Sequence, residues 1–273
     1  MTRRRLMLLA ALVVVLLLAV AWAVRHPSHD RNWAVEQSIV PRAEFDGTRV
    51  TIRGVRNFRW TGATTHTPAW EDRSYDLDRL ATAWYVLVPF SEKFRGPAHA
   101  FVSFGFDDGR YLAISVEARR EAGETYGVVA GMFRRYELIY VVGDEQDLIG
   151  RRAVFDDDEV FLYPVRASRE AIRAVFIAML ERANQLHQRP EFYNTLTNNC
   201  TLNLVRQVNQ LSPGLIPTAS WRIVLPGYSD AVVHRLGLID STGSVAEVRA
   251  RFRINERAAA ALGNPDFSRL IRE

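Results

Sequence analysis

The sequence contains a single cysteine, Cys200, and a single lysine, Lys93, among its 273 residues. One cysteine excludes an internal disulfide bond and any metal site built from several thiolates. The 35 basic side chains barely outnumber the 31 acidic ones and are interspersed with them, so no concentrated basic region favours nucleic-acid binding. We expect no nucleic-acid partner, no metal and no cofactor, which leaves any chemistry to ordinary side chains.

Charge is also lacking from Leu6 to Val24, directly after the basic stretch Thr2–Arg5. As a helix, these residues would extend about 28 Å, close to the thickness of the hydrocarbon core of a membrane. The arginines favour the cytoplasmic side, so we expect a single membrane-spanning anchor with the rest of the chain outside the cytoplasm. The small residues in Ala21-Trp22-Ala23 leave a cleaved signal peptide as the alternative.

Cys200 directly precedes an amphipathic stretch that predicts a helix over Thr201–Leu211. A thiol at a helix N-terminus experiences the positive end of the peptide dipoles, which lowers its pKa and favours the reactive thiolate. The alternative is an inert core residue, because free cysteines are often buried as small apolar side chains. A histidine and a glutamate elsewhere in the chain favour the first interpretation.

Residues 98–118 predict a β-hairpin, because two alternating apolar stretches flank an Asp-Asp-Gly turn in which Gly109 suits the left-handed position. A two-residue loop would mix Glu117 and Ser115 into the apolar face, which argues against that register. A three-residue loop places His99 directly opposite Glu117 instead. It also makes one face wholly apolar, consisting of Ala98, Ala100, Val102, Phe104, Leu112, Ile114 and Val116.

His99 and Glu117 share the other face of this hairpin. Directly opposed side chains have Cβ atoms about 4.5 to 5.5 Å apart, so the carboxylate can orient the imidazole. With Cys200, they supply the nucleophile, base and orienting acid that thiol-dependent acyl transfer requires. We expect the small or semi-polar residues of the same face to form the floor of a cleft, with Ser103 as a substrate contact; they are Phe101, Ser103, Ala113 and Ser115.

Four further residues are candidates for substrate binding or for stabilising an oxyanion. The backbone N–H of Cys200 is a natural oxyanion donor, helped by the side chain of Tyr193 or Asn199. For Asn198 and Asn199, capping of the helix is an equally strong prediction. Arg119 follows Glu117 by two residues and shares its face, where it could bind a phosphate or a carboxylate; a solvated surface arginine is the alternative.

The order of histidine, glutamate on the next strand and cysteine at a helix start resembles the circularly permuted branch of the papain-like (NlpC-type) thiol enzymes. A closer resemblance is carried by a larger set of residues: Arg56–Trp60, Trp70–Leu80, His99–Phe104, Ser115–Arg119, Gly143–Glu145, and Tyr193 with Asn198–Cys200. On these residues, the chain resembles the bacterial periplasmic domain family named for the Lnb lipoprotein N-acyltransferase. This resemblance extends over roughly Val50 to Gly237.

The resemblance implies an acyl-enzyme thioester that is charged from a membrane phospholipid and passes its acyl group to the α-amine of a lipoprotein's N-terminal cysteine. Two alternatives stay open. The same three residues can cleave a peptidoglycan peptide or an amide with water as the acceptor. The chain can also be a noncatalytic envelope-binding module that keeps the fold.

The fold that we expect is α+β, with an antiparallel sheet that contains the hairpin and the Cys200 helix packed across it. The predicted domain organisation is a membrane anchor over residues 1–25, a linker over 26–44 and a papain-like catalytic domain over 45–240. A charged helical tail over 241–273 is expected to pack outside the core. The implied location is the bacterial inner membrane, with the catalytic domain in the periplasm.

Overall fold

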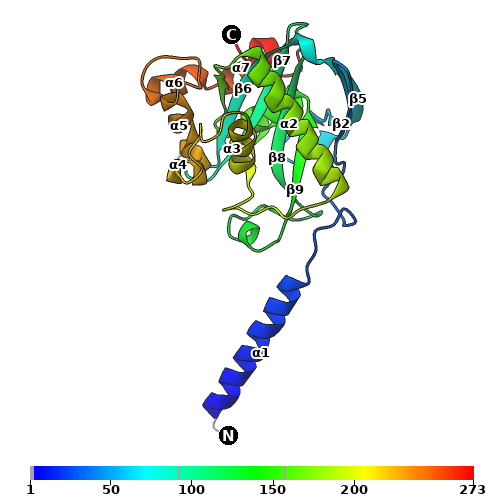
Figure 1. The fold of residues 1–273 in the computed structure, drawn as a ribbon, viewed down its shortest axis with the longest axis vertical. Coiled ribbons are helices and arrows are strands. Elements are labelled where there is room, and N and C mark those ends of the chain that lie inside the picture. Colours follow the sequence, from blue (N-terminus) through cyan, green and yellow to red (C-terminus); the bar gives the residue numbers. More distant parts are fainter. Residues whose placement is uncertain (1–2, 92, 157) are drawn as a thin grey trace.

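The computed structural model describes residues 3–91, 93–156 and 158–273, except for the side chains at positions 9, 11, 15 and 17–23. Helix α1 (Arg3–Ala23) extends away from a mixed α/β body (Figure 1). Among the residues described, no helix is both long and apolar enough to cross a membrane. Several side chains of the expected span Leu6–Val24 are among those that the structure does not describe. The membrane anchor therefore stays a prediction.

The body is built on one sheet whose strands run in the order β1-β2-β9-β8-β7-β6-β10, with β5 pairing on β2. All of its pairings are antiparallel except that of β2 with β9, where Arg56 lies beside Gly143. The mixed α/β architecture with a mostly antiparallel sheet agrees with the predicted fold class. The strands are β1 (Arg42–Asp46), β2 (Arg49–Arg56), β5 (Trp70–Asp76), β6 (Leu80–Pro89), β7 (Ala98–Phe106), β8 (Tyr111–Arg119), β9 (Glu137–Gly143) and β10 (Phe161–Pro164), and β3 (Arg59–Trp60) pairs separately with β4 (His66–Thr67).

Strands β7 and β8 form the predicted hairpin in the predicted register. Phe101 pairs with Ser115, and the backbone N–H of Phe106 donates to the carbonyl of Arg110 over 2.9 Å. Gly109 has φ +83°, the left-handed conformation that the three-residue turn requires. The alternation of apolar side chains therefore fixed this register correctly.

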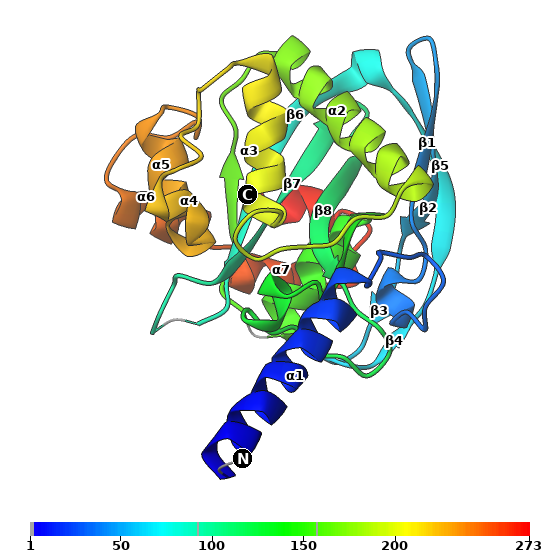
Figure 2. The same cartoon turned by 60° about the horizontal axis from the view of Figure 1, so that its bottom comes forward.

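Helices α2 (Arg169–Gln188) and α3 (Cys200–Leu211) cover one face of the sheet (Figures 1 and 2). The side chain of Ser168 caps α2 by accepting a hydrogen bond from the backbone N–H of Ala171. Phe176 of α2 packs edge-on against Phe104 of β7, with ring centroids 4.9 Å apart. The apolar face of the hairpin is thus buried under these helices, as its sequence pattern predicts.

The opposite face of the sheet is also buried, which the sequence did not lead us to expect. It is covered by the π-helix η4 (Gln146–Phe155) and by α7 (Asn255–Ala261) and α8 (Phe267–Leu270) of the C-terminal region. The prediction that the tail packs outside the core is therefore wrong. Five apolar residues of this charged stretch are buried against that face; they are Ile254, Ala258, Ala261, Phe267 and Ile271.

Residues 26–44, expected to be a linker, dock against the end of β8. The backbone N–H of Ala34 donates to the carbonyl of Arg120, and that of Ala122 donates to the carbonyl of Asn32. The segment contains the 3-10 helix η1 (Val35–Gln37), whose Gln37 is almost fully buried. This segment is part of the folded body, and it reaches the site described below.

The remaining helices are short. They are α4 (Trp221–Val224), α5 (Ser229–Arg235) and α6 (Val245–Phe252), with the 3-10 helices η2 (Leu77–Arg79), η3 (Ala130–Met132) and η5 (Pro226–Tyr228).

Candidate active site

Cys200 is the first residue of α3, and its side chain is buried. Asn199 caps the helix: its Oδ1 accepts a hydrogen bond of 2.8 Å from the backbone N–H of Leu202. Thr201 Oγ1 lies 3.8 Å from Cys200 Sγ. Burial raises the pKa of the Cys200 thiol above its ordinary value, although the backbone N–H of Ala100 acts in the opposite direction. The predicted lowering by the helix N-terminus is therefore outweighed by desolvation, and the resting thiol is neutral.

His99 lies on β7, one residue before the backbone N–H that approaches the sulfur. Its Nε2 is 2.7 Å from Ser115 Oγ, and its ring stacks on Phe101 with centroids 5.3 Å apart. Burial and, to a lesser extent, the nearby Arg152 lower the pKa of His99 to about 3, although Glu117 acts in the opposite direction. The imidazole is therefore neutral near pH 7 and can act as a base.

Glu117 reaches His99 through a hydroxyl group rather than by direct contact. Ser115 Oγ donates to Glu117 Oε1 over 2.9 Å and lies between the carboxylate and the imidazole. Two residues apart on one strand, Ser115 and Glu117 share a face, so the shorter side chain occupies the space beside the ring. The expected histidine–glutamate contact is thus corrected to a three-membered chain of hydrogen bonds.

The protonation states along this chain follow from the carboxylate. Burial favours the neutral acid, but Arg152 and Arg56 outweigh it and hold the pKa of Glu117 well below its ordinary value of 4.5. An ionised carboxylate only accepts hydrogen bonds, so Ser115 must donate to it. The serine oxygen then accepts from Nε2–H of His99, which leaves the lone pair on Nδ1. These hydrogen bonds therefore select the tautomer of His99 in which Nδ1 carries the lone pair and can accept a proton.

Cys200, His99 and Glu117 line one cavity of about 360 Å³. Gln37 from η1 closes one side, and its Nε2 donates to Glu117 Oε2 over 2.7 Å. Arg152 from η4 lies 3.5 Å from Glu117 Oε1. The full lining is Glu36, Gln37, Arg56, Phe90, Ala98, His99, Val116, Glu117, Ala118, Arg120, Tyr126, Leu148, Arg151, Arg152, Asp156, Tyr193 and Cys200.

Four arginines line this cavity, and three of them are paired with carboxylates. Arg56 is buried and forms two hydrogen bonds, of 2.9 and 3.0 Å, with the carboxylate of Asp147. Arg151 forms an ion pair of 3.2 Å with Asp156. Within the part of the chain that the structure describes, no hydrogen bond or ion pair holds the guanidinium of Arg120, so this group is available to an anionic substrate.

Of the candidate substrate or oxyanion residues, Tyr193 lies at the cavity. Its hydroxyl is 3.2 Å from the hydroxyl of Tyr126, and burial, with the charge of a Cys200 thiolate, raises the pKa of Tyr193. Asn198 instead holds the loop before α3: its Nδ2 donates to the carbonyl of Phe192 and its Oδ1 accepts from Arg206. Asn199 thus has the capping role that was the alternative for it, whereas Asn198 holds the loop instead of capping the helix.

The expectation for Ser103 is wrong. Ser103 is fully buried on the face covered by the C-terminal helices, where its hydroxyl donates to Glu145. That carboxylate pairs with Arg272 at 2.6 Å. The predicted cleft floor is therefore packed core, and on this face of the hairpin the cavity is lined by His99 and Glu117 instead.

Arg119 does not face the cavity either. Its guanidinium donates to the carbonyls of Gln37 and Ser38, each over 2.8 Å, and lies 4.0 Å from the ring centroid of Trp33. Burial lowers the pKa of Arg119 to about 10. This arginine fixes the docked N-terminal segment instead of binding a phosphate or a carboxylate. Arg120, the next residue, takes the position at the cavity.

Sequence reasoning missed Gln37 and Arg152 entirely. Gln37 lies in a short segment with no periodic pattern, and Arg152 lies on a π-helix that follows β9. Neither has a sequence neighbour that marks it as functional. Only their approach to Glu117 from distant parts of the chain shows that they belong to the site.

In a comparison with protein families, the model of the Lnb N-terminal periplasmic domain matches residues 66–227, more than half of the chain. The chain belongs to the Lnb N-terminal periplasmic domain family. The matched part of this Lnb-type protein contains His99, Ser115, Glu117 and Cys200. It is an envelope-associated protein of the periplasm. Comparisons with curated proteins and with solved structures found no match, and the papain-like relationship stays a prediction.

Proposed function

We propose that this Lnb-type protein is a cysteine-dependent acyltransferase that works through a thioester acyl-enzyme. One observation carries this proposal: Cys200, His99 and Glu117 line the same cavity, and Ser115 joins the last two by hydrogen bonds. A nucleophile, a base and a group that orients the base are the elements that covalent acyl transfer requires.

In the first step, Nδ1 of His99 takes the thiol proton while the sulfur of Cys200 attacks the carbonyl carbon of an ester. The carbon–oxygen bond of the ester breaks, and the leaving alcohol receives the proton from His99. The backbone N–H groups of Cys200 and Ala100 both lie close enough to the sulfur to favour its thiolate. They are the candidates for stabilising the oxyanion of the tetrahedral intermediate.

In the second step, an amine attacks the thioester carbonyl. His99 takes a proton from the amine, the carbon–sulfur bond breaks, and the proton passes to the departing sulfur. The products are an amide and the free thiol. In the form that the family resemblance implies, the donor is a membrane phospholipid and the acceptor is the α-amine of a lipoprotein.

The anchor belongs to the same proposal. A span over Leu6–Val24 would make this a single-pass protein of the inner membrane, with the cavity on the periplasmic side and close to lipid. Such an arrangement would bring both substrates to the site without a soluble carrier.

A hydrolase is the second candidate, because the wall of the catalytic cavity is polar and arginine-rich. A cysteine amidase or peptidase that acts on peptidoglycan or envelope peptides would use the same attack, with water in place of the amine. The free guanidinium of Arg120 favours a substrate that carries a carboxylate or a phosphate. A noncatalytic envelope-binding module is the third candidate, and it would not need the thiol.

Intact-mass spectrometry tests the first proposal. The purified protein is incubated with vesicles of phosphatidylethanolamine and phosphatidylglycerol that carry a single kind of acyl chain. We expect one acyl adduct on the wild type, released by neutral hydroxylamine, and none on Cys200→Ala. Absence of the adduct together with cleavage of muropeptides would move the assignment to the hydrolase. Retention of in-cell function by Cys200→Ala would leave only the binding module.

A further inference from the structure

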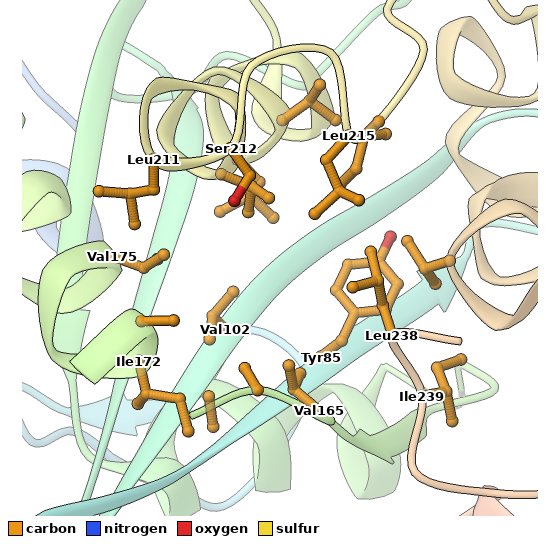
Figure 3. A pocket seen from close by; sticks show the side chains of 18 of the residues that line it. Tyr85, Val102, Val165, Ile172, Val175, Leu211, Ser212, Leu215, Leu238 and Ile239 are labelled. Atoms are coloured by element: carbon orange, nitrogen blue, oxygen red, sulfur yellow. The ribbon is translucent and has the colours of Figure 1, made fainter. Parts of the chain in front are cut away.

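A second cavity, of about 180 Å³, lies beside the catalytic one, between α2, α3 and the sheet (Figure 3). Ile172 and Val175 of α2 point into it from one side, and Val102 and Tyr85 of the strands form its floor (Figure 3). Many of the other lining residues are aliphatic and come from α3 and from the loops that follow α3 and α5: Leu204, Val205, Val208, Leu211, Leu215, Ile216, Leu238 and Ile239.

Of the four hydroxyl groups at this cavity, those of Tyr85 and Ser229 have partners within the protein, that of Thr201 lies beside Cys200 Sγ, and that of Ser212 belongs to an exposed residue. Tyr85 and Ser229 hydrogen-bond to each other over 2.7 Å, and Ser229 also donates to the carbonyl of Pro226. A ligand would therefore find apolar contact here and few groups to hydrogen-bond. Apolar cavities of about 150 Å³ stay free of water and accept small hydrocarbons. The chemistry of the lining thus selects a hydrocarbon.

The apolar cavity lies next to the nucleophile. Thr201 lines it, and Oγ1 of the same residue lies 3.8 Å from Cys200 Sγ. Tyr85 also lines it, and a thiolate at Cys200 acts on the hydroxyl of Tyr85 strongly enough to help raise its pKa, after burial and Asp230. At the start of α3, Cys200 therefore lines the polar cavity, and the next residue, Thr201, lines the apolar cavity.

The far end of the apolar cavity reaches the surface. Leu211 and Leu215 contribute to its lining, yet 44% and 36% of their surface is exposed. Leu211 is the last residue of α3, and Leu215 lies in the loop after it. The cavity therefore runs along the helix from Thr201 toward the opening. An unbranched chain longer than the cavity could extend past this opening.

We propose that this apolar cavity holds the acyl chain of the donor and of the acyl-enzyme, while the polar cavity holds the remainder of the substrate. This inference rests on the proposed function, and it names the substrate class as an ester of a long unbranched fatty acid. The thioester carbonyl would lie at Cys200 and the chain would pass Thr201 toward Leu211. The two cavities thus divide one amphipathic substrate at its ester.

Substitution of Val208 tests this placement. Val208→Phe fills the cavity from α3, and Gln210→Phe adds the same ring to an exposed position of the same helix as a control. The probes are p-nitrophenyl acetate and p-nitrophenyl decanoate, with the release of p-nitrophenolate as the measure of acylation. We expect the decanoate-to-acetate ratio of acylation rates to fall about tenfold or more in Val208→Phe, because buried methylene groups lose their contacts, and to stay unchanged in Gln210→Phe. An unchanged ratio in Val208→Phe would overturn the proposal.

A binding measurement separates failure of this inference from failure of the proposed function. If neither ester acylates Cys200 of the wild type, the acyltransferase proposal fails, and the cavity is then tested alone. The fluorescent fatty acid cis-parinaric acid is titrated into Cys200→Ala and into Cys200→Ala/Val208→Phe. One saturable site in the first that is lost in the second supports a hydrocarbon site. No saturable binding to Cys200→Ala, or equal binding to both, refutes it.

Discussion

The side-chain amide of Gln37 donates a hydrogen bond of 2.7 Å to Glu117, a residue 80 positions away in the sequence. The same amide donates to the carbonyl of Ala118 over 3.1 Å, and its oxygen accepts from the backbone N–H of Arg120 over 2.8 Å. Both the nitrogen and the oxygen of the Gln37 side-chain amide are thereby held by hydrogen bonds. The segment that follows the apolar N-terminus is consequently a wall of the candidate active site.

Replacement of Gln37 by leucine should impair the site through Glu117. The substitution removes a donor that stabilises the carboxylate, so the pKa of Glu117 should rise toward 4.5 and the acid limb of the activity profile should move to higher pH. Stability should fall by about 1 to 3 kcal/mol, because a buried carbonyl and a buried N–H lose their partners. The measurements are the pH profile of acylation and urea unfolding. Gln188→Leu, at an exposed position of α2, is the control and should change neither.

Replacement of Ser115 by alanine should separate His99 from Glu117 without unfolding the hairpin. We expect the acylation rate to fall, but by less than the factor of about 10² to 10⁴ that a general base itself contributes, because His99 remains. Ser74→Ala on the exposed strand β5 is the matched control. If Ser115→Ala retained the wild-type rate and pH profile, the hydroxyl would have no positioning role.

The thiol of Cys200 should react slowly near neutral pH. Burial raises its pKa above 9.0, and His99 with a pKa of about 3 is not charged to stabilise a thiolate. Alkylation by iodoacetamide should therefore increase with pH and show its midpoint above pH 9.0. The rate is measured by intact mass between pH 5 and about 10, across the ordinary thiol range. A plateau that begins near pH 5 would instead indicate a preformed thiolate–imidazolium pair.

Folding stability should fall in acid because of His99. Its pKa is lowered from 6.5 when unfolded to about 3 when folded, so the unfolded chain binds more protons between these values. The contribution of His99 to the free energy of unfolding is therefore fully present above pH 6.5. It decreases as the pH falls toward the folded-state pKa, by at most about 1.4 kcal/mol per pH unit. Urea unfolding of His99→Asn should show a flatter dependence between pH 6.5 and 4.5, where Glu117 does not yet contribute. His29→Asn should flatten it less, because that ring is only partly buried.

The neighbours Arg119 and Arg120 should behave differently. Arg119→Met removes two hydrogen bonds to the docked segment, so trypsin should cleave after Arg31 faster and stability should fall by about 1 to 3 kcal/mol. Arg120→Met should leave unfolding unchanged and raise KM for substrates that carry a phosphate or a carboxylate. Equal effects of the two substitutions on proteolysis would contradict the assignment of Arg119 to anchoring.

Local patterns determined much of this protein. The alternation of apolar residues fixed the β7–β8 register, the turn glycine fixed the loop length, and Asn199 with the stretch after Cys200 indicated a capped helix. These features depend on neighbours in sequence or on one hairpin, where the periodicity of two or 3.6 residues decides which side is buried. The same patterns brought His99, Glu117 and Cys200 together as candidates.

The tertiary structure decided what lies around them. Whether Ser103 faced a cleft or a core depended on the C-terminal helices that cover it, and the roles of Gln37 and Arg152 depended on segments far away in sequence. The reactivity of Cys200 was decided in the same way: its helix position alone predicts a lowered pKa, but the packing around it removes water and raises that pKa. Sequence periodicity specifies a residue's face, whereas burial, desolvation and long-range contacts exist only once the chain has folded.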